Sequence, residues 1–182
     1  MWRHTCCAMQ PHTPLPCRWV LGQAEALPLA DQTVDRVLMS LVLHQIVHRQ
    51  QALHEVYRVL RPGGRVLVRT VAPEVTLQAW VPFRFFPTVA QVEAARLPAI
   101  DGIFTMCRQA GFRELHTRTV CRNARVALHK VTEELRQRNR PSYRLLTNTE
   151  LEDGLRRIKQ EWCAKGGQWV DPKPHVLITA VK

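Results

Sequence analysis

The sequence has no long run of apolar residues. None of its apolar stretches approaches the roughly 20 residues that a membrane-spanning helix needs, so we expect no contact with a membrane. The start of the chain, residues 1–7, also lacks the apolar core of a secretory signal. Six cysteines among 182 residues do not make a disulfide framework. These absences favour an intracellular protein with reduced thiols, and we expect it to be cytoplasmic.

The cysteines and histidines do not have the spacing of a metal site. Zinc ligands usually come in pairs such as C-x₂-C that a longer loop separates. The segment before residue 18 has only an irregular series, and we expect no metal there: His4, Cys6, Cys7, His12 and Cys17. The remaining cysteines are expected to lie on apolar faces as small core residues: Cys107, Cys121 and Cys163.

Acidic residues are scarce relative to basic ones. The chain has 15 aspartates and glutamates against 26 lysines and arginines, which gives a formal net charge of +11. Twenty-one of the basic residues are arginines, and nine of these lie within residues 108–144. A surplus of positive charge is typical of proteins that bind nucleic acid or other polyanions. It is equally typical of arginines spread over solvated faces, so charge alone leaves both interpretations open.

Periodic apolar patterns begin only after residue 17. Residues 1–17 contain three cysteines, three prolines and two histidines, with neither helical nor strand periodicity. We expect this segment to be unstructured. Residues 18–182 have the length and the apolar content of one domain, since 46% of the whole chain is hydrophobic.

The first half of this domain alternates strand and helix patterns. Strands are expected at 18–21, 34–41 and 64–70, and the second has the near-continuous apolar run of a strand buried on both faces. A helical stripe occupies residues 50–60 and ends at Pro62–Gly64. Strand, helix and strand in this order predict a right-handed crossover in a parallel sheet.

Residues 71–100 do not continue this alternation. They are interrupted by prolines and contain four aromatic residues that predict a lid over the sheet rather than a strand: Trp80, Phe83, Phe85 and Phe86. Asp101 is the expected N-cap of the helix that follows.

The end of the chain predicts an antiparallel edge to the sheet. Strands are expected at 112–120 and 175–181, and two helices between them at about 124–138 and 149–163. The second of these helices is expected to open with a capping box at Thr149.

Three segments together carry a resemblance to a known family. They are Gly22–Asp31, Val34–His44 and Glu55–Gly64, the last ending in Arg-Val-Leu-Arg-Pro-Gly-Gly. In this order and spacing they resemble the central motifs of class I S-adenosylmethionine-dependent methyltransferases, of the small-molecule kind called type 11. The resemblance implies an α/β, Rossmann-like methyltransferase sheet with helical and lid insertions. It also implies transfer of a methyl group from S-adenosylmethionine to a small-molecule acceptor.

The resemblance implies which residues would contact the cofactor. The family segment that matches Gln23, Ala24 and Glu25 lies along the adenine, and relatives often carry an acid where this chain has Gln23. The segment that matches Ser40 and Leu41 ends a strand beside the sulfonium and its departing methyl group.

His44 follows the second of these segments, at the expected mouth of the pocket. A histidine there can deprotonate an acceptor heteroatom, because its pKa is close to neutral. A packing or hydrogen-bonding role is the other interpretation, so His44 is only a candidate catalytic residue.

The family's glycine-rich loop is not found among the 182 residues, since none of the eight glycines forms a G-x-G motif. We therefore expect a sheet without its first strands and without the cofactor-binding half. Each hydrogen bond to a charged group contributes on the order of 1.5–3 kcal/mol. Losing two or three of them predicts cofactor binding weaker by roughly three to six decades, and little or no activity.

A second hypothesis follows from that weak binding. A chain that has lost catalysis can still use its basic helices, and it would then be a binding protein for RNA or for an acidic protein partner.

Overall fold

The computed structural model describes residues 18–77, 79–125, 127–167 and 170–182. Residues 1–17 lie outside the described residues. Two expectations therefore stay predictions: that this segment is unstructured, and that no metal is bound by His4, Cys6, Cys7, His12 and Cys17. Among those described, no helix is both long and apolar enough to cross a membrane.

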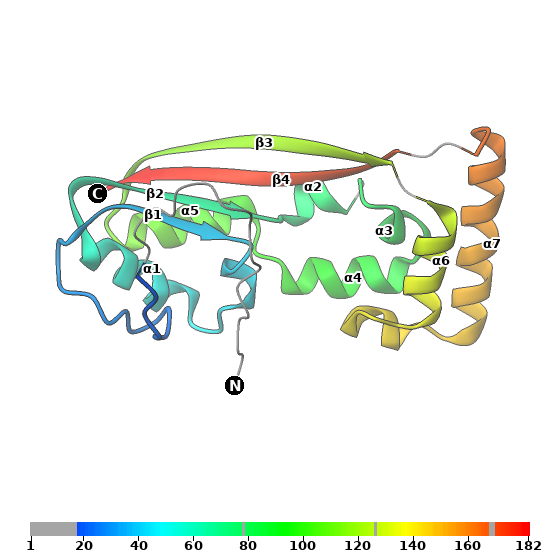
Figure 1. Cartoon of the computed structure of the whole chain (residues 1–182), viewed down its shortest axis with the longest axis horizontal. Coiled ribbons are helices and arrows are strands. Elements are labelled where there is room, and N and C mark those ends of the chain that lie inside the picture. Colours follow the sequence, from blue (N-terminus) through cyan, green and yellow to red (C-terminus); the bar gives the residue numbers. More distant parts are fainter. Residues whose placement is uncertain (1–17, 78, 126, 168–169) are drawn as a thin grey trace.

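Four strands form one sheet in the order β1-β2-β4-β3 (Figure 1). β1 (Val34–Ser40) and β2 (Leu60–Thr70) are parallel. β4 (Val170–Val181) is antiparallel to both β2 and β3 (Arg113–Arg125). The parallel pair and the antiparallel edge pair confirm the α/β, Rossmann-like prediction, and the sheet is small.

The expected strand at 18–21 is wrong. Residues 18–22 form no strand, and the side chains of Trp19 and Leu21 are 78% and 97% exposed. The only pairing nearby is an isolated bridge between Gln23 and Ala26. A short apolar run becomes a strand only where a neighbouring strand takes up its backbone hydrogen bonds, and the described residues offer it none.

Helix α1 (Arg49–Val59) connects β1 to β2, as the periodicity predicts. It ends in an extended residue, Leu60, and not in a left-handed glycine. The Pro-Gly-Gly turn follows as a bulge within β2, because Leu60 pairs with Val34 and the next pair is Arg65 with Arg36. Gly63 has a φ of +76°, which glycine adopts without strain.

One face of the sheet is covered by two helices, α1 and α5 (Ile100–Gln109) (Figure 1). Leu53 of α1 and Ile103 of α5 are fully buried against Val68 of β2 and Ile178 of β4. This packing is the hydrophobic core of the sheet. Cys107 lies in it, whereas Cys121 and Cys163 are exposed, contrary to the expectation that all three are core residues.

A second core lies at the end of the sheet and is built from helices (Figure 1). The helices are α3 (Val81–Phe85), α4 (Pro87–Arg96), α6 (Leu128–Arg136), η2 (Pro141–Leu145) and α7 (Asn148–Ala164). The short α2 (Pro73–Thr76) lies against β4 instead, and its Val75 packs on the core of the sheet. Phe86 and Ile158 are fully buried in this core. A Cβ at Gly154 of α7 would lie 2.1 Å from Cε1 of Phe86, so only glycine permits this close approach.

Two helix starts differ from the prediction. The N-cap of α7 is Thr147, whose hydroxyl accepts a hydrogen bond from the Glu150 N–H at 3.1 Å, so the capping residue is not Thr149. α5 begins before Asp101, and the Ile100 N–H donates instead to Oε1 of Glu74 at 3.0 Å. Several Ser, Thr and Asp residues lie close together in these segments, and tertiary packing decides which one caps.

Candidate functional site

A cavity of about 220 Å³ lies where β1 and β2 end. Leu41 directly follows β1, and Val71 directly follows β2. His175 of β4 completes this side, next to Val176, which pairs with Thr70 at the end of β2. Open α/β sheets bind ligands at the carboxyl ends of their parallel strands, so the position is that of a ligand site.

The opposite wall of the cavity comes largely from residues 71–100, the segment predicted to be a lid. Trp80 and Phe83 are stacked, with ring centroids 5.4 Å apart and an interplanar angle of 21°. The complete lining is Leu41, His44, Gln45, Val71, Thr76, Trp80, Phe83, Glu93, Arg96, Leu97, Arg140 and His175. The lid prediction is confirmed for Trp80 and Phe83. It is wrong for Phe85 and Phe86, which pack into the helical core.

Three polar atoms in this lining are buried and have no hydrogen-bond partner among the described residues. They are Nδ1 of His44, Oγ1 of Thr76 and Nε1 of Trp80. A buried polar atom without a partner costs about 1–3 kcal/mol, and most such atoms are satisfied in folded proteins. Their position in one cavity makes them candidate contacts for a polar ligand.

One ion pair and one further arginine define the charge of the cavity wall. The Glu93 carboxylate accepts hydrogen bonds from Nε and Nη2 of Arg96 at 3.1 and 2.5 Å. Arg140 has no carboxylate partner among the described residues, and its Cζ lies 5.7 Å from the Trp80 ring centroid. The cavity therefore has one uncompensated positive charge.

Both histidines of the lining are shifted toward the neutral form. Burial lowers the pKa of His44, and the charges of Arg96 and Arg49 lower it further against the opposing effect of Glu93. Burial lowers the pKa of His175 as well, with a further contribution from Arg69. A neutral imidazole can accept a proton or a hydrogen bond at neutral pH.

The turn that carries Leu41 and His44 is held in a fixed geometry. Leu41 has a φ of +54°, a region that residues other than glycine seldom adopt, while its N–H donates to the Arg69 carbonyl at 2.7 Å. Arg49 Nε donates to the Leu43 carbonyl at 3.2 Å. Backbone strain of this kind persists where surrounding contacts determine it, and it is common at functional sites.

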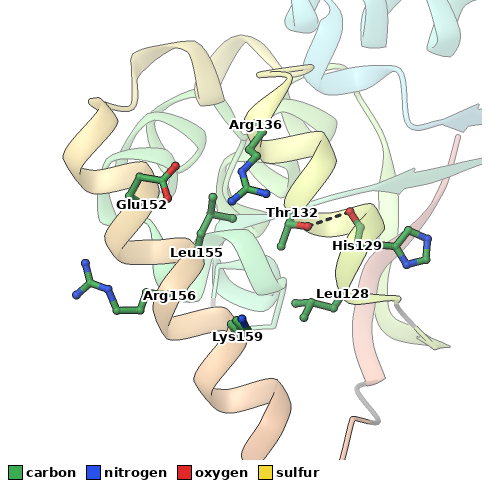
Figure 2. A pocket seen from close by; sticks show the side chains of 8 residues that line it. All are labelled: Leu128, His129, Thr132, Arg136, Glu152, Leu155, Arg156 and Lys159. Atoms are coloured by element: carbon green, nitrogen blue, oxygen red, sulfur yellow. Dashed lines mark hydrogen bonds between the residues drawn. The ribbon is translucent and has the colours of Figure 1, made fainter.

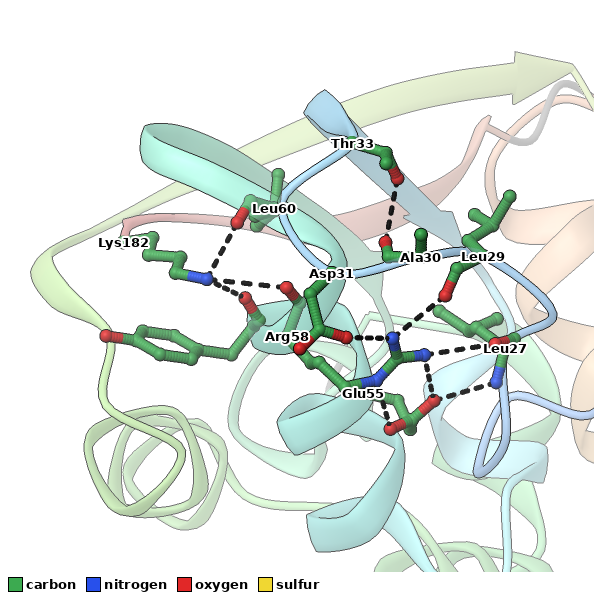
Figure 3. A network of polar contacts seen from close by, with 10 residues as sticks. Leu27, Leu29, Ala30, Asp31, Thr33, Glu55, Arg58, Leu60 and Lys182 are labelled. Atoms are coloured by element: carbon green, nitrogen blue, oxygen red, sulfur yellow. Dashed lines mark hydrogen bonds and ion pairs between the residues drawn. The ribbon is translucent and has the colours of Figure 1, made fainter.

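The loop that contains the expected adenine-contacting residues packs on α1, since Gln51 Nε2 donates to the Glu25 carbonyl at 3.1 Å. Figure 3 shows how the following residues of the loop, Leu27 to Asp31, contact Glu55 and Arg58 of the helix. Arg58 joins the loop to the helix by donating to Asp31 Oδ1 at 2.6 Å and to both oxygens of Glu55 at 2.8 Å. Glu55 Oε2 accepts from the Leu27 N–H at 2.9 Å, and the hydrogen bonds from Arg58 lower the pKa of Glu55. Ion pairs and hydrogen bonds therefore fix this loop on α1.

The sequence-predicted site residues divide into two groups. Leu41 and His44 line the cavity. Ser40 is exposed at the end of β1, and the loop that contains Gln23, Ala24 and Glu25 does not line the cavity.

Sequence reasoning missed most of the polar lining. Thr76, Glu93, Arg96, Arg140 and His175 belong to no motif, and they come from four separate parts of the chain. The only available signal was the aromatic cluster, which correctly placed the segment 71–100 over the sheet.

Comparison with known proteins gives matches in sequence. Residues 4–68 match the model of a methyltransferase domain family. The ubiquinone/menaquinone biosynthesis C-methyltransferase UbiE of Roseobacter denitrificans is 34% identical over 120 residues, which are 56% of this chain and 48% of that protein. The biotin biosynthesis bifunctional protein BioHC of Cellvibrio japonicus is 40% identical over 76 residues, which are 40% of this chain and 15% of that protein.

Comparison with solved structures gives the same fold. A protein described as a methyltransferase from an antibiotic biosynthesis pathway of Anabaena variabilis has a TM-score of 0.61 at 19% identity, covering 89% of this chain and 72% of that one. A protein of Bacillus halodurans, also described as a methyltransferase, has a TM-score of 0.52 at 22% identity and covers 90% of this chain and 76% of that one. At these identities the likeness concerns the fold alone.

The matches confirm the predicted resemblance. The match to the methyltransferase domain family covers residues 4–68, and the solved structures share the fold of the chain. The chain spans about half the length of the curated UbiE relatives, 45% to 50%. The family match begins inside residues 1–17, which are not described, so the boundary expected at residue 18 stays a prediction.

Proposed function

We propose that the protein takes part in methyl transfer from S-adenosylmethionine to a small-molecule acceptor, and that the acceptor binds in the cavity at the ends of β1 and β2. One observation carries this proposal: three unpartnered polar atoms are buried in a cavity at the position where α/β sheets bind ligands. The family match supports the type of reaction. The composition further favours a cytoplasmic location.

The residues proposed to hold the cofactor are Gln23, Ala24, Glu25, Ser40 and Leu41. The donor set fits its polar groups, because the side chains of Gln23 and Glu25 have no hydrogen bond among the described residues and are not buried. When bound, S-adenosylmethionine supplies an electrophilic methyl group that the acceptor attacks in line. The strained turn at Leu41 fixes the cavity wall at the end of β1, and positioning of this kind accounts for most of the catalysis in such a displacement.

His44 is proposed as the group that takes a proton from the acceptor. Its Nδ1 is buried in the cavity wall without a partner, and its lowered pKa keeps it unprotonated near neutral pH. A heteroatom of the acceptor that donates to Nδ1 becomes a better nucleophile as its proton moves to the ring.

An NMR titration with S-adenosylhomocysteine tests the proposal. The full chain is titrated to several millimolar, a concentration that detects the weak binding expected from the sequence. We expect backbone amide shifts at Gln23–Glu25 and at Ser40 and Leu41. The absence of shifts at both segments, or shifts confined to other elements, would overturn the proposal.

A groove between α6 and α7 favours a second candidate function (Figure 2). Its volume is about 540 Å³. Leu128 and Leu155 provide apolar surface in it, and Arg136 and Lys159 have no acidic partner among the described residues. The remaining lining is His129, Thr132, Glu152 and Arg156. We propose that this groove binds an acidic protein segment, since apolar and cationic groups are combined in it.

Fluorescence anisotropy with a labelled poly-glutamate peptide tests this second candidate. The double variant Arg136→Gln/Lys159→Gln should lose at least tenfold in affinity. The control Arg118→Gln/Arg122→Gln on β3 removes the same charge and should lose less than twofold. Equal losses in both variants, or tighter binding of a single-stranded RNA of equal charge, would contradict a specific acidic-protein site.

A further inference from the structure

The charges around the cavity are unbalanced in favour of cations. The single carboxylate of the lining, Glu93, is 8% exposed and is already paired with Arg96. Arg140 has no such partner among the described residues, and Arg49 lies behind the wall with its Nη2 donating to the Arg96 carbonyl at 3.2 Å. The lowered pKa values of His44 and His175, to which arginines contribute, are consistent with a positive potential in the cavity.

Arg140 is exposed overall, and its guanidinium lies against two aromatic rings with no hydrogen bond to the described residues. Its Cζ lies 5.7 Å from the ring centroid of Trp80 and 5.8 Å from that of Tyr143, which is 2% exposed. Aromatic faces hold a guanidinium by cation–π attraction and leave its N–H groups free for an oxyanion.

The unpartnered atoms add donors beside this cation. Trp80 Nε1 can only donate, and the Thr76 hydroxyl can donate as well as accept. A carboxylate has about four lone-pair positions and is the complement of such a donor-rich wall. His44 Nδ1 remains available for a second polar atom of the ligand.

The size of the cavity limits the ligand. Its volume of about 220 Å³ is below the roughly 300–1,000 Å³ of pockets for drug-sized molecules. Trp80 and Phe83, whose rings stack on each other, give the cavity an aromatic wall. A molecule with one ring and one charged group fits both properties.

We propose that the acceptor taken by this cavity is a small planar molecule with a carboxylate or similar oxyanion, which Arg140 binds together with the N–H of Trp80. This substrate class rests on the methyl transfer proposed above. Arg140 is then a specificity-determining residue, because a neutral analogue leaves its charge without a partner.

Binding of benzoate and of its neutral isostere benzamide tests the proposal. The Trp80 indole N–H resonance, assigned with Trp80→Phe, is followed while each probe is added to the full chain. We expect benzoate to shift this resonance and to bind at least tenfold more tightly than benzamide. Arg140→Gln should weaken benzoate at least tenfold and leave benzamide within twofold.

Arg144→Gln is the matched control, since Arg144 lies on η2 and does not line the cavity. It removes the same charge and should change benzoate binding less than twofold. Arg140→Lys separates charge from geometry, and we expect an intermediate affinity because a lysine lacks the planar fork. A thermal melt of each variant confirms that it folds.

Three results would overturn the proposal: equal affinity for both probes, equal losses in Arg140→Gln and Arg144→Gln, or no binding of either probe at 10 mM. The S-adenosylhomocysteine titration keeps the two proposals separate. Benzoate binding without shifts from S-adenosylhomocysteine would count against methyl transfer and leave the anion site intact. The opposite pattern would count against the anion site alone.

Discussion

At the scale of single residues, the cavity wall combines features that lower stability and favour binding. Thr76 is fully buried with an unpartnered hydroxyl, and the Nδ1 of His44 and Nε1 of Trp80 are in the same state. In the absence of ligand each atom has lost its water without gaining a hydrogen bond. Functional sites commonly keep such groups at the expense of stability.

Thr76→Val tests this trade-off, because valine has nearly the same shape and no hydroxyl. We expect the free energy of unfolding of the free protein to rise by about 1–2 kcal/mol as an unsatisfied buried group is removed. Benzoate binding should weaken in the same variant. Urea unfolding and the indole titration measure the two effects, and a loss of stability would mean that the Thr76 hydroxyl is satisfied in solution.

The two histidines of the cavity predict a pH dependence of stability. Their pKa values in the folded protein lie below the ordinary 6.5. Below pH 6.5 the unfolded chain therefore binds more protons than the folded one, so stability falls as the pH decreases toward the folded pKa values.

Urea unfolding at pH 7.5 and at pH 5.5 measures this effect. The double variant His44→Gln/His175→Gln should show a smaller loss between the two pH values than the wild type. Replacing the exposed His116 by glutamine is the control and should leave the loss unchanged. An undiminished loss in the double variant would assign the effect to other groups.

At the scale of elements, local patterns predicted those strands and helices that have a partner nearby. β1 followed from its apolar run and α7 from its helical stripe, and both positions agree with the structure. The expected burial of β1 on both faces is wrong, because β1 lies at the edge of the described sheet and only Met39 on it is buried. The run at 18–21 failed because strand formation depends on a neighbour that periodicity does not reveal. Of the cavity, Leu41 and His44 could be found from a motif, whereas Thr76 and Arg140 are brought together only by the packing of helices.

Gly154 is an element-scale test of that helical packing. Gly154→Ala raises helix propensity, yet its Cβ would lie 2.1 Å from Cε1 of the fully buried Phe86. We expect a net loss of about 1–3 kcal/mol, because overpacking a core outweighs propensity.

Gly102→Ala is the matched control, since a Cβ at Gly102 of α5 has no atom within 4 Å. This variant should gain up to about 1 kcal/mol from propensity alone. Chemical denaturation of both proteins compares the two glycines. Similar changes in stability would mean that α7 does not pack as closely on Phe86 as described.

At the scale of the whole molecule, the cavity lies between two hydrophobic cores. Leu41 and Val71 belong to the sheet side, while Trp80 and Phe83 belong to the helical core. A ligand in the cavity therefore contacts both, and its binding stabilises their relative arrangement. In a thermal melt, saturating benzoate should accordingly raise the unfolding temperatures of both cores by the same amount.

The outer edge of β1 has a consequence for the behaviour of the protein in concentrated solution. No strand of the described residues pairs with this edge, and Leu38 on the strand is 65% exposed. Unpaired N–H and C=O groups beside an apolar side chain can template strand addition between molecules.

We expect concentration-dependent association, and Leu38→Lys should suppress it by placing a charge on the edge. Leu145→Lys, at a site that is 57% exposed and away from the sheet, should have no such effect in sedimentation velocity. Equal association of the two variants would place the contact elsewhere.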